Sequence, residues 1–388
     1  MALSTGIERI RIRNYRVLRD VELDGLTPIT ALLGPNGSGK STVFDALSFV
    51  HEALMGGLES AWTRRDGLAE IRSRDSSGAV EIEVACRVAG DLFVYVLGVD
   101  EEDGVPLAVH ERLSWSPDES GNLVGILDFR LGEGQIRGPG DDGWRSQRLT
   151  GPRLLAVSAL GQLAGNRHIT SFLEFMGGIQ LIDLDVSAMR SGTRGVRRGT
   201  GLDPNGDNLA MRVEYLREEQ PGEWAEILGA LRRYVPGLED FLPLRLGDGS
   251  HIVRLKERGR EQPILPENIS DGTLLLLGYL VALHSPVAVL LLEEPENQVH
   301  PRLHYPLADD ARGAAAEQVI IATHAPRFVD ALRPSEVWAF ARNGDGFAEA
   351  KRAADETPVV RMVEDGAALG ALWTEGYFRF GDPLAERP

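Results

Sequence analysis

Residues 32–47 read LLGPNGSGKSTVFDAL, and Gly34 to Ser41 match the octet G-x-x-x-x-G-K-[ST] at every fixed position. The glycines in this octet allow backbone angles that turn successive N–H groups toward one anion. An apolar stretch, PITALLG, precedes the octet, and STVFDALSFVHEAL follows it with helical spacing of its apolar residues. This strand–loop–helix context predicts a phosphate-binding loop rather than a glycine-rich turn without a ligand.

The residues of the loop have separate tasks in such a site. Lys40 can reach the β and γ phosphate oxygens, and the hydroxyl of Ser41 can ligate Mg²⁺. The helix that begins here adds the positive end of its dipole. The sequence therefore predicts a nucleotide held by Gly34, Asn36, Gly37, Ser38, Gly39, Lys40, Ser41 and Thr42.

The composition limits the class of protein. The chain has 388 residues, of which 43% are hydrophobic and 26% charged, as in a globular protein with a proper core. The single cysteine, Cys86, excludes an intramolecular disulfide and cysteine-rich zinc, and favours a reducing, cytoplasmic location. A net charge of −17 argues against a surface that attracts nucleic acid or anionic lipid everywhere.

One apolar stretch approaches the length of a membrane span. Residues 274–292, LLLLGYLVALHSPVAVLLL, are interrupted by His284, Ser285 and Pro286. Proline inside a helix costs about 3 kcal/mol. We therefore expect a buried helix, a turn and a buried strand, and no membrane association.

Three further motifs follow in the second half of the chain. VAVLLLEEPE (287–296) reads as a buried strand ending in carboxylates, which can hold Mg²⁺ or polarise a water. IIATHAP (320–326) belongs to a second apolar strand, QVIIATH, the last strand that we expect, and it ends at a histidine. NISDGT (268–273) opens a helix, with Ser270 as a plausible N-cap. Strands alternating with helices around a phosphate loop indicate an α/β domain.

In this order, NYR, GPNGSGKST, ISDGT, LLLEEPE and ATHAP resemble the ABC-type ATPase heads of the RecF, SMC and OLD group, above all short stand-alone members. The motifs span residues 14–326. The resemblance implies a P-loop NTPase fold, a mixed sheet with helices on both sides, plus an antiparallel β subdomain and a mostly helical insertion. The boundaries expected are 1–105 and 241–388 for the two halves of the head, and 106–240 for the insertion. Residues from about 105 to 150 are rich in Gly, Asp and Ser, as expected of hairpins, and residues from about 152 to 241 are expected to be mostly helical.

The resemblance also implies roles for single residues. ATP and Mg²⁺ are the expected cofactors, and hydrolysis to ADP and phosphate the expected reaction. Two chains would pair head to tail, as a homodimer or a higher even oligomer. The roles carried over are the phosphate-proximal arginine (Arg16), the signature motif that completes the opposite subunit's site (Ser270, Asp271, Gly272), the Walker B residue on Mg²⁺ (Glu293), the catalytic glutamate (Glu294) and the switch histidine (His324).

The sequence departs from the family pattern in three places. Glu293 replaces the commoner Walker B aspartate. No glutamine occurs between Ser41 and Gly134, so the Q-loop has no evident equivalent. Only 230 residues separate Lys40 from Ser270, which is far too few for the long coiled-coil arms of SMC proteins.

The partners of such an ATPase are open. OLD proteins often carry a TOPRIM nuclease after the ATPase, but only 64 residues follow His324, so we expect a separate effector such as a nuclease. DNA could contact Arg190, Arg194, Arg197 and Arg198, or a second group at Arg64, Arg65, Arg72 and Arg74; solvated loops are the alternative for both groups.

Three functional classes remain. The first is a nucleotide-gated sensor or scaffold in an anti-phage defence or nuclease-partnered system, which the acidity and the missing nuclease favour. The second is a RecF-like DNA-binding ATPase in repair or recombination. The third is a transporter ATPase subunit, against which the NYR strand and the SDGT signature argue.

Overall fold

The computed structural model describes residues 3–117, 122–138, 143–163, 165–194 and 201–380. The chain folds into two compact units. Unit 1 comprises Met1–Ile179, Pro334–Ala367 and Leu372–Pro388; unit 2 comprises Gln180–Arg333 and Ala368–Ala371. The boundaries expected at 105/106 and 240/241 were drawn from motif content, and they stay predictions.

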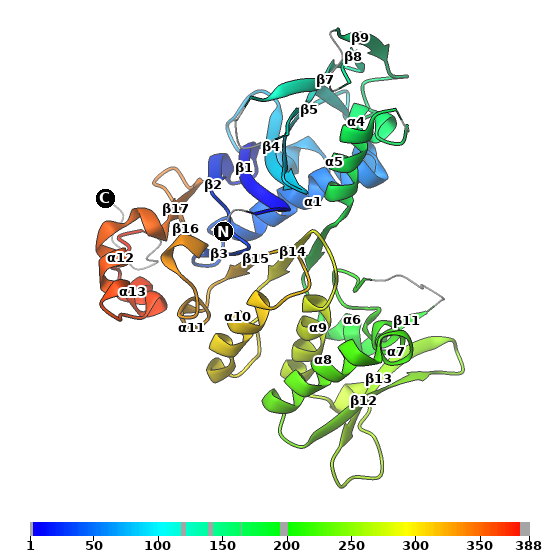
Figure 1. Ribbon diagram of the computed structural model, residues 1–388, viewed down its shortest axis with the longest axis vertical. Helices are drawn as coiled ribbons and strands as arrows, with labels where there is room; N and C mark the ends of the chain where they lie inside the picture. The colour runs from blue at the N-terminus through cyan, green and yellow to red at the C-terminus, as the bar shows by residue number, and fades with distance from the viewer. Residues whose placement is uncertain (1–2, 118–121, 139–142, 164, 195–200, 381–388) are drawn as a thin grey trace. The chain divides into compact units, whose positions relative to one another are not determined.

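The larger sheet of unit 1 is antiparallel and has the strand order β2-β1-β4-β5-β6-β7-β8-β9 (Figure 1). It confirms the expected antiparallel β subdomain and the hairpins expected between 105 and 150. Its strands are β1 (Gly6–Tyr15), β2 (Leu18–Asp24), β4 (Val80–Val88), β5 (Asp91–Glu102), β6 (Val105–Ser116), β7 (Val124–Arg130), β8 (Glu133–Ile136) and β9 (Arg145–Arg148).

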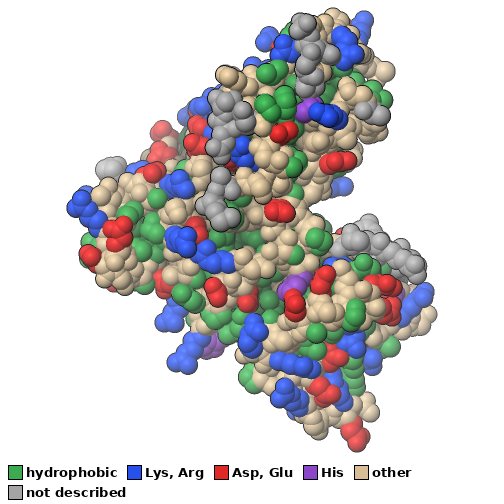
Figure 2. Space-filling view, in the orientation of Figure 1, with side chains coloured by type: hydrophobic (Ala, Val, Ile, Leu, Met, Phe, Trp, Pro, Cys, Tyr) green, Lys and Arg blue, Asp and Glu red, His purple; other side chains and the backbone are tan. Residues whose placement is uncertain are grey.

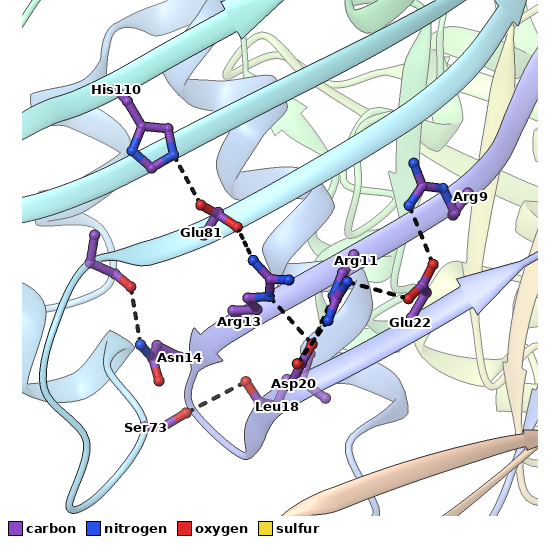
Figure 3. A network of polar contacts seen from close by, with 11 residues as sticks. Arg9, Arg11, Arg13, Asn14, Leu18, Asp20, Glu22, Ser73, Glu81 and His110 are labelled. Atoms are coloured by element: carbon purple, nitrogen blue, oxygen red, sulfur yellow. Dashed lines mark hydrogen bonds and ion pairs between the residues drawn. The ribbon is translucent and has the colours of Figure 1, made fainter. Parts of the chain in front are cut away.

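Strand β1 shows why this sheet has one buried and one solvated face. Its isoleucines Ile10 and Ile12 are each 1% exposed, whereas the alternating arginines point to the other face. There Arg13 donates to Glu81 across 2.6 Å (Figure 3). The same face carries the pairs Arg9–Glu22 and Arg11–Asp20. These acids neutralise the arginines of β1.

Helices cover the buried face of the sheet. The ring of Phe49, on α1 (Lys40–Gly56), lies 6.2 Å from that of Tyr15 on β1. Phe172, on α5 (Arg167–Gly177), lies 5.0 Å from Tyr95 on β5. The remaining helices of unit 1 are α2 (Leu58–Thr63), α3 (Leu68–Ile71), α4 (Ala156–Leu160), α12 (Thr357–Glu364) and the 3₁₀ turns η3 (Pro334–Glu336) and η4 (Ala353–Asp355); the residues of α13 (Leu369–Thr374) are divided between the units.

Unit 1 also contains the strand that carries the phosphate loop. This strand, β3 (Ile29–Leu33), is buried at every residue and pairs in parallel with β16 (Val337–Arg342). Strand β17 (Ala348–Arg352) continues the order β3-β16-β17. Our expectation that QVIIATH is the last strand was wrong. The tail after it supplies β16, because VWAFA is a short apolar run of the kind that parallel strands require.

Unit 2 confirms the reading of residues 274–292. Helix α9 (Asp271–Leu283) is followed by a turn at His284 and Ser285 and by the strand β14 (Val289–Glu293). Strand β14 pairs in parallel with β15 (Gln318–Thr323), in the order β10-β14-β15. No helix within the described residues is long and apolar enough to cross a membrane.

Unit 2 further contains a smaller antiparallel sheet, β11-β13-β12, against which α7 packs. The described residues of the segment expected to be mostly helical, 152–241, form the helices α4 to α8 but also the strands β10 and β11 and the start of β12. The remaining elements of unit 2 are β10 (Ile179–Ile182), α6 (Val186–Ser191), β11 (Thr193–Arg194), α7 (Leu209–Glu219), α8 (Pro221–Tyr234), β12 (Leu238–Arg245), β13 (Ser250–Glu257), η1 (Pro266–Asn268), η2 (Pro301–Leu303), α10 (His304–Arg312) and α11 (Pro326–Val329).

Candidate functional site

The phosphate loop lies between β3 and α1 in unit 1, where the octet predicts it. Gly37 and Gly39 have φ of +74° and +113°, which side chains other than glycine adopt only with strain. A Cβ on Gly34 would lie 2.5 Å from the carbonyl oxygen of Phe340, so this position also requires glycine. The loop conformation therefore depends on all three glycines.

The start of α1 has the features of an anion site. Its N-cap is Gly39, which has no side chain to cap the helix, and its first turn contains no acidic residue. The first N–H groups of a helix have no acceptor within the helix. These open donors and the helix dipole favour an anion at this position.

Two buried polar groups complete the phosphate loop. The ammonium of Lys40 is inside the loop, 2.8 Å from the carbonyl oxygen of Gly34 and 3.0 Å from that of Pro35. The Ser38 hydroxyl is buried and has no hydrogen-bond partner among the described residues. A buried polar atom without a partner is costly unless a ligand satisfies it. The residues present therefore fit a bound phosphate.

Arg16 occupies the tight turn between β1 and β2, with φ of +50°. Its guanidinium lies 3.1 Å from the carboxylate of Asp45, one turn into α1. Asp45 also accepts hydrogen bonds from the hydroxyl of Tyr15 (2.7 Å) and from Arg65 (2.8 Å). Burial raises the pKa of the Tyr15 hydroxyl, so tyrosine stays a donor. Asp45 thus fixes Arg16 to the helix of the phosphate loop.

An arginine-lined cavity of about 780 Å³ adjoins this turn in unit 1. Arg342 connects it to the phosphate loop, because its Nε donates to the carbonyl oxygen of Gly37 across 2.6 Å. Arg19 covers the ring of Phe347 at 4.4 Å. The arginines of this cavity are Arg16, Arg19, Arg72, Arg74 and Arg342, set against the acids Glu70, Asp75 and Asp345.

The arginines of the second group expected from the sequence therefore have different surroundings and do not all face one surface. Arg65 is 8% exposed and bound to Asp45 and Glu52, so it is a structural residue and not a DNA contact. Arg72 and Arg74 line the cavity instead. The Arg19–Phe347 contact and the link through Arg342 were missed, since they join residues more than 300 positions apart in the sequence.

In unit 2 the carboxylates and the histidine expected from the sequence meet at neighbouring strand ends. Glu294 directly follows β14, and His324 directly follows the parallel strand β15. Nδ1 of His324 lies 3.1 Å from Oε1 of Glu294. Glu294 has φ of +41°, an uncommon backbone conformation for a non-glycine residue that is frequent at functional sites.

Two residues without a predicted role in the chemistry hold this pair. The amide of Asn297 donates to Oε2 of Glu294 across 2.8 Å. Glu296 is 4% exposed and accepts hydrogen bonds from the Thr323 hydroxyl and from the backbone N–H of His324 (3.2 Å). The side chains of Asn297 and His324 therefore fix both oxygens of the Glu294 carboxylate. In the sequence, the dipeptide Glu296-Asn297 directly after EEP was the signal that could have identified these two residues.

The expected signature motif forms the N-terminus of α9. Ser270 is the N-cap, and its Oγ accepts from the N–H of Thr273 (3.3 Å). A Cβ on Gly272 would lie 2.6 Å from the carbonyl oxygen of Gln298, so only glycine fits against this segment. Ser270 is exposed, and the first N–H groups of α9 lie beside it.

A cavity of about 310 Å³ lies within unit 2 between the signature and the strand ends. Glu294 and Asn297 contribute to one wall, and Asp271 and Arg190 to another. Arg190 was expected to be a candidate DNA contact. It is hydrogen-bonded to the signature loop instead. Arg194 ends the short strand β11, and Arg197 and Arg198 lie outside the described residues.

A family model described as "AAA domain, putative AbiEii toxin, Type IV TA system" matches residues 29–330. The match includes both the phosphate loop and the strand ends with Glu294 and His324. The chain belongs to this AAA family. The resemblance to the ABC-type heads of the RecF, SMC and OLD group is confirmed, and the fold is that of a P-loop NTPase head.

Two curated proteins have sequences similar to this AAA domain. The OLD nuclease of Thermus scotoductus is 24% identical over 351 residues, which are 84% of this chain and 60% of the nuclease. The chain thus spans about three fifths of the length of that relative. The chromosome partition protein Smc of Methanocaldococcus jannaschii is 43% identical over 44 residues, which are 11% of this chain and 4% of Smc.

Solved structures similar to this AAA domain include SMC heads. An Smc head bound to the C-terminal winged-helix domain of ScpA is 13% identical, with a TM-score of 0.47 and coverage of 89% of this chain and 97% of that chain. The Smc head of Pyrococcus furiosus, with an extended coiled coil and bound to the C-terminal domain of ScpA, is 12% identical. Its TM-score is 0.48, and coverage is 93% of this chain and 100% of that one.

Proposed function

We propose that this AAA domain binds ATP with Mg²⁺ and hydrolyses it to ADP and phosphate. The observation that carries the proposal is the phosphate loop, with an uncapped helix start, a central lysine and a buried serine hydroxyl that has no partner in the described part of the chain. The arginine-lined cavity beside it supplies further positive charge for a nucleotide. The second support is Glu294, held by two side chains at a strand end.

In this proposal each residue has a defined task. Lys40 neutralises the β and γ phosphates, and Glu294 accepts a proton from the attacking water. His324 orients the Glu294 carboxylate. Mg²⁺ would supply charge neutralisation on the phosphates, with Ser41 and Glu293 as its protein ligands. Mg²⁺ at such sites takes one or two protein ligands beside phosphates and waters. Among the described residues there is no cluster of three or more His, Cys, Asp and Glu side chains that could hold a metal ion without a nucleotide.

We further propose that two copies pair head to tail around ATP. The support is the exposed N-terminus of α9, at which Ser270 and the N–H groups near Gly272 form a donor set suited to an anion. In such a pair, the signature of one copy faces the nucleotide on the phosphate loop of the other. Each nucleotide would then need both copies for hydrolysis.

The biological role that we propose is a nucleotide-gated sensor or scaffold that works with an effector such as a nuclease or toxin. Support comes from the family description, which names a toxin system, and from the similarity to an OLD nuclease. On the face in Figure 2, basic and acidic side chains are interleaved, and this gives no support to a broad nucleic-acid surface. A RecF-like role would show as ATP turnover stimulated by DNA.

The experiment that tests the ATPase proposal is steady-state ATP turnover with Mg²⁺. We expect Lys40→Ala to abolish nucleotide binding and turnover, and Glu294→Gln to abolish turnover while ATP still binds. Lys351→Ala and Glu349→Gln, at exposed positions on β17, are the matched controls and should turn over ATP like the wild type. Equal turnover in Lys40→Ala and the wild type would contradict the proposal.

A further inference from the structure

Arg190 makes three contacts to the loop that leads into the signature motif. Its Nε donates to the carbonyl oxygen of Pro266 (3.1 Å), and its Nη2 donates to that of Ile269 (2.7 Å). The same Nη2 contacts the carboxylate of Asp271, the first residue of α9. Ser270 lies between two of these partners in the sequence. One guanidinium thus binds the chain on both sides of the signature serine.

Arg190 is itself held firmly by the packing of α6. Met189, beside it, is 1% exposed and packs with Leu184 on Gly278 of α9. A Cβ on Gly278 would lie 2.9 Å from Leu184 and 3.2 Å from the Met189 sulfur, so glycine permits this close approach. At the other end of α6, Asp185 caps the helix by accepting from the N–H of Ala188 (2.6 Å).

The signature serine has no comparable support of its own. Ser270 is exposed, and the hydrogen bonds that its side chain makes stay within the first turn of α9. On the opposite side, the carbonyl oxygen of Gln298 contacts Gly272 through van der Waals packing. A planar guanidinium can bind two carbonyls and a carboxylate in a fixed geometry, which a lysine ammonium cannot reproduce.

We propose that Arg190 is a positioning residue that fixes the signature motif in the conformation that a nucleotide of a second copy recognises. This inference rests on the proposed ATPase function. Arg190 lies on α6, outside every motif of the head, and would nevertheless set the conformation of the signature. Residues 184–190 and the start of α9 then move as one body, and a partner that shifts α6 would shift the signature with it.

Two measurements test the proposal on Arg190→Ala and Arg190→Lys. Arg217→Ala is the matched control, because Arg217 is equally exposed (29% against 28%) and also binds one carboxylate and one backbone carbonyl, yet lies on α7. The first measurement is hydrogen–deuterium exchange of residues 266–275. We expect exchange about fivefold faster in Arg190→Ala, intermediate in Arg190→Lys and unchanged in Arg217→Ala.

The second measurement is ATP turnover. We expect Arg190→Ala to lower kcat about tenfold with KM for ATP within about twofold, since the phosphate loop is untouched. If residues 266–275 of Arg190→Ala exchange at the wild-type rate, the proposal is overturned. Faster exchange with unchanged ATP turnover also overturns it, because Arg190 would then have only a structural role. If the wild type and Lys40→Ala show equally little turnover, the ATPase proposal fails instead, and the exchange result still decides whether Arg190 holds the signature.

Discussion

Glu294 illustrates how single residues define this site. Its backbone adopts a left-handed conformation directly after β14, which turns the carboxylate out of the strand. His324 and Asn297 each contact one of its oxygens, at 3.1 and 2.8 Å. A carboxylate held at both oxygens keeps one orientation toward a water. Positioning of this kind is a main part of catalysis in phosphoryl transfer.

Removal of the Asn297 amide should therefore slow the chemical step. We expect Asn297→Ala to lower kcat for ATP about tenfold, with KM for ATP little changed, because a hydrogen bond to a charged group is lost. Gln220→Ala is the control, since Gln220 makes a similar amide contact (3.0 Å) to Glu223 on α8. A loss of the same size in the control, or none in Asn297→Ala, would show that Asn297 does not orient Glu294.

Sequence could predict only part of this residue-scale picture. The octet placed Lys40 and Ser41 because the loop is contiguous in the chain, and the strand-end rule placed Glu294 and His324. The contacts of Arg342 with Gly37 and of Arg190 with the signature loop could not be predicted. They join residues distant in the sequence, and an isolated arginine in a glycine-rich stretch carries no sign of its partner.

At the scale of elements, a buried carboxylate fixes α4 to the antiparallel sheet. Glu111 on β6 is 1% exposed and accepts hydrogen bonds from the Tyr95 hydroxyl (3.0 Å) and from the N–H of Val157 (3.0 Å). The N–H of Ala156 donates to its other oxygen. Burial raises the pKa of Glu111 to about 7, although these hydrogen bonds oppose the shift.

This contact makes the stability of unit 1 depend on pH. A carboxyl with a folded pKa of about 7 and an ordinary value of 4.5 binds more protons when folded, so stability falls as pH rises between them. We expect Glu111 to lower the free energy of unfolding by about 2 to 3 kcal/mol more at pH 8 than at pH 5. The quantity to measure is the free energy of unfolding in urea, compared with Glu111→Gln.

The difference in unfolding free energy between the wild type and Glu111→Gln should shift by that amount between pH 5 and pH 8. Glu133→Gln, at an exposed position on β8, is the control for the loss of a strand glutamate. A difference for Glu111→Gln that is independent of pH would contradict the raised pKa. Glu111 could not be recognised from the sequence, since a glutamate in a strand is usually solvated.

Elements whose patterns are local were predicted well. The apolar block at 274–292 specifies its own structure, and its helix, turn and strand were confirmed. The strands β10 and β16 were missed. Both are short, and short apolar runs do not distinguish a strand from a helix without the neighbours that pair with them.

The whole chain divides its motifs between two units. Unit 1 contains the phosphate loop and Arg16; unit 2 contains the signature, the carboxylates and His324. The sequence predicted the family of this ATPase head from the order of its motifs. A partner, in the proposed role, would be recognised by surface chemistry, which motif order does not reveal.

The most direct test of the account is the mass of Glu294→Gln in solution with and without ATP and Mg²⁺, measured by light scattering. In the proposed function this variant binds ATP without hydrolysing it, so we expect a stable pair of chains with nucleotide and a lower mass without it. The double variant Lys40→Ala/Glu294→Gln should not pair, since its phosphate loop is disabled. A Glu294→Gln chain that binds ATP and keeps the same mass with and without it would contradict the account.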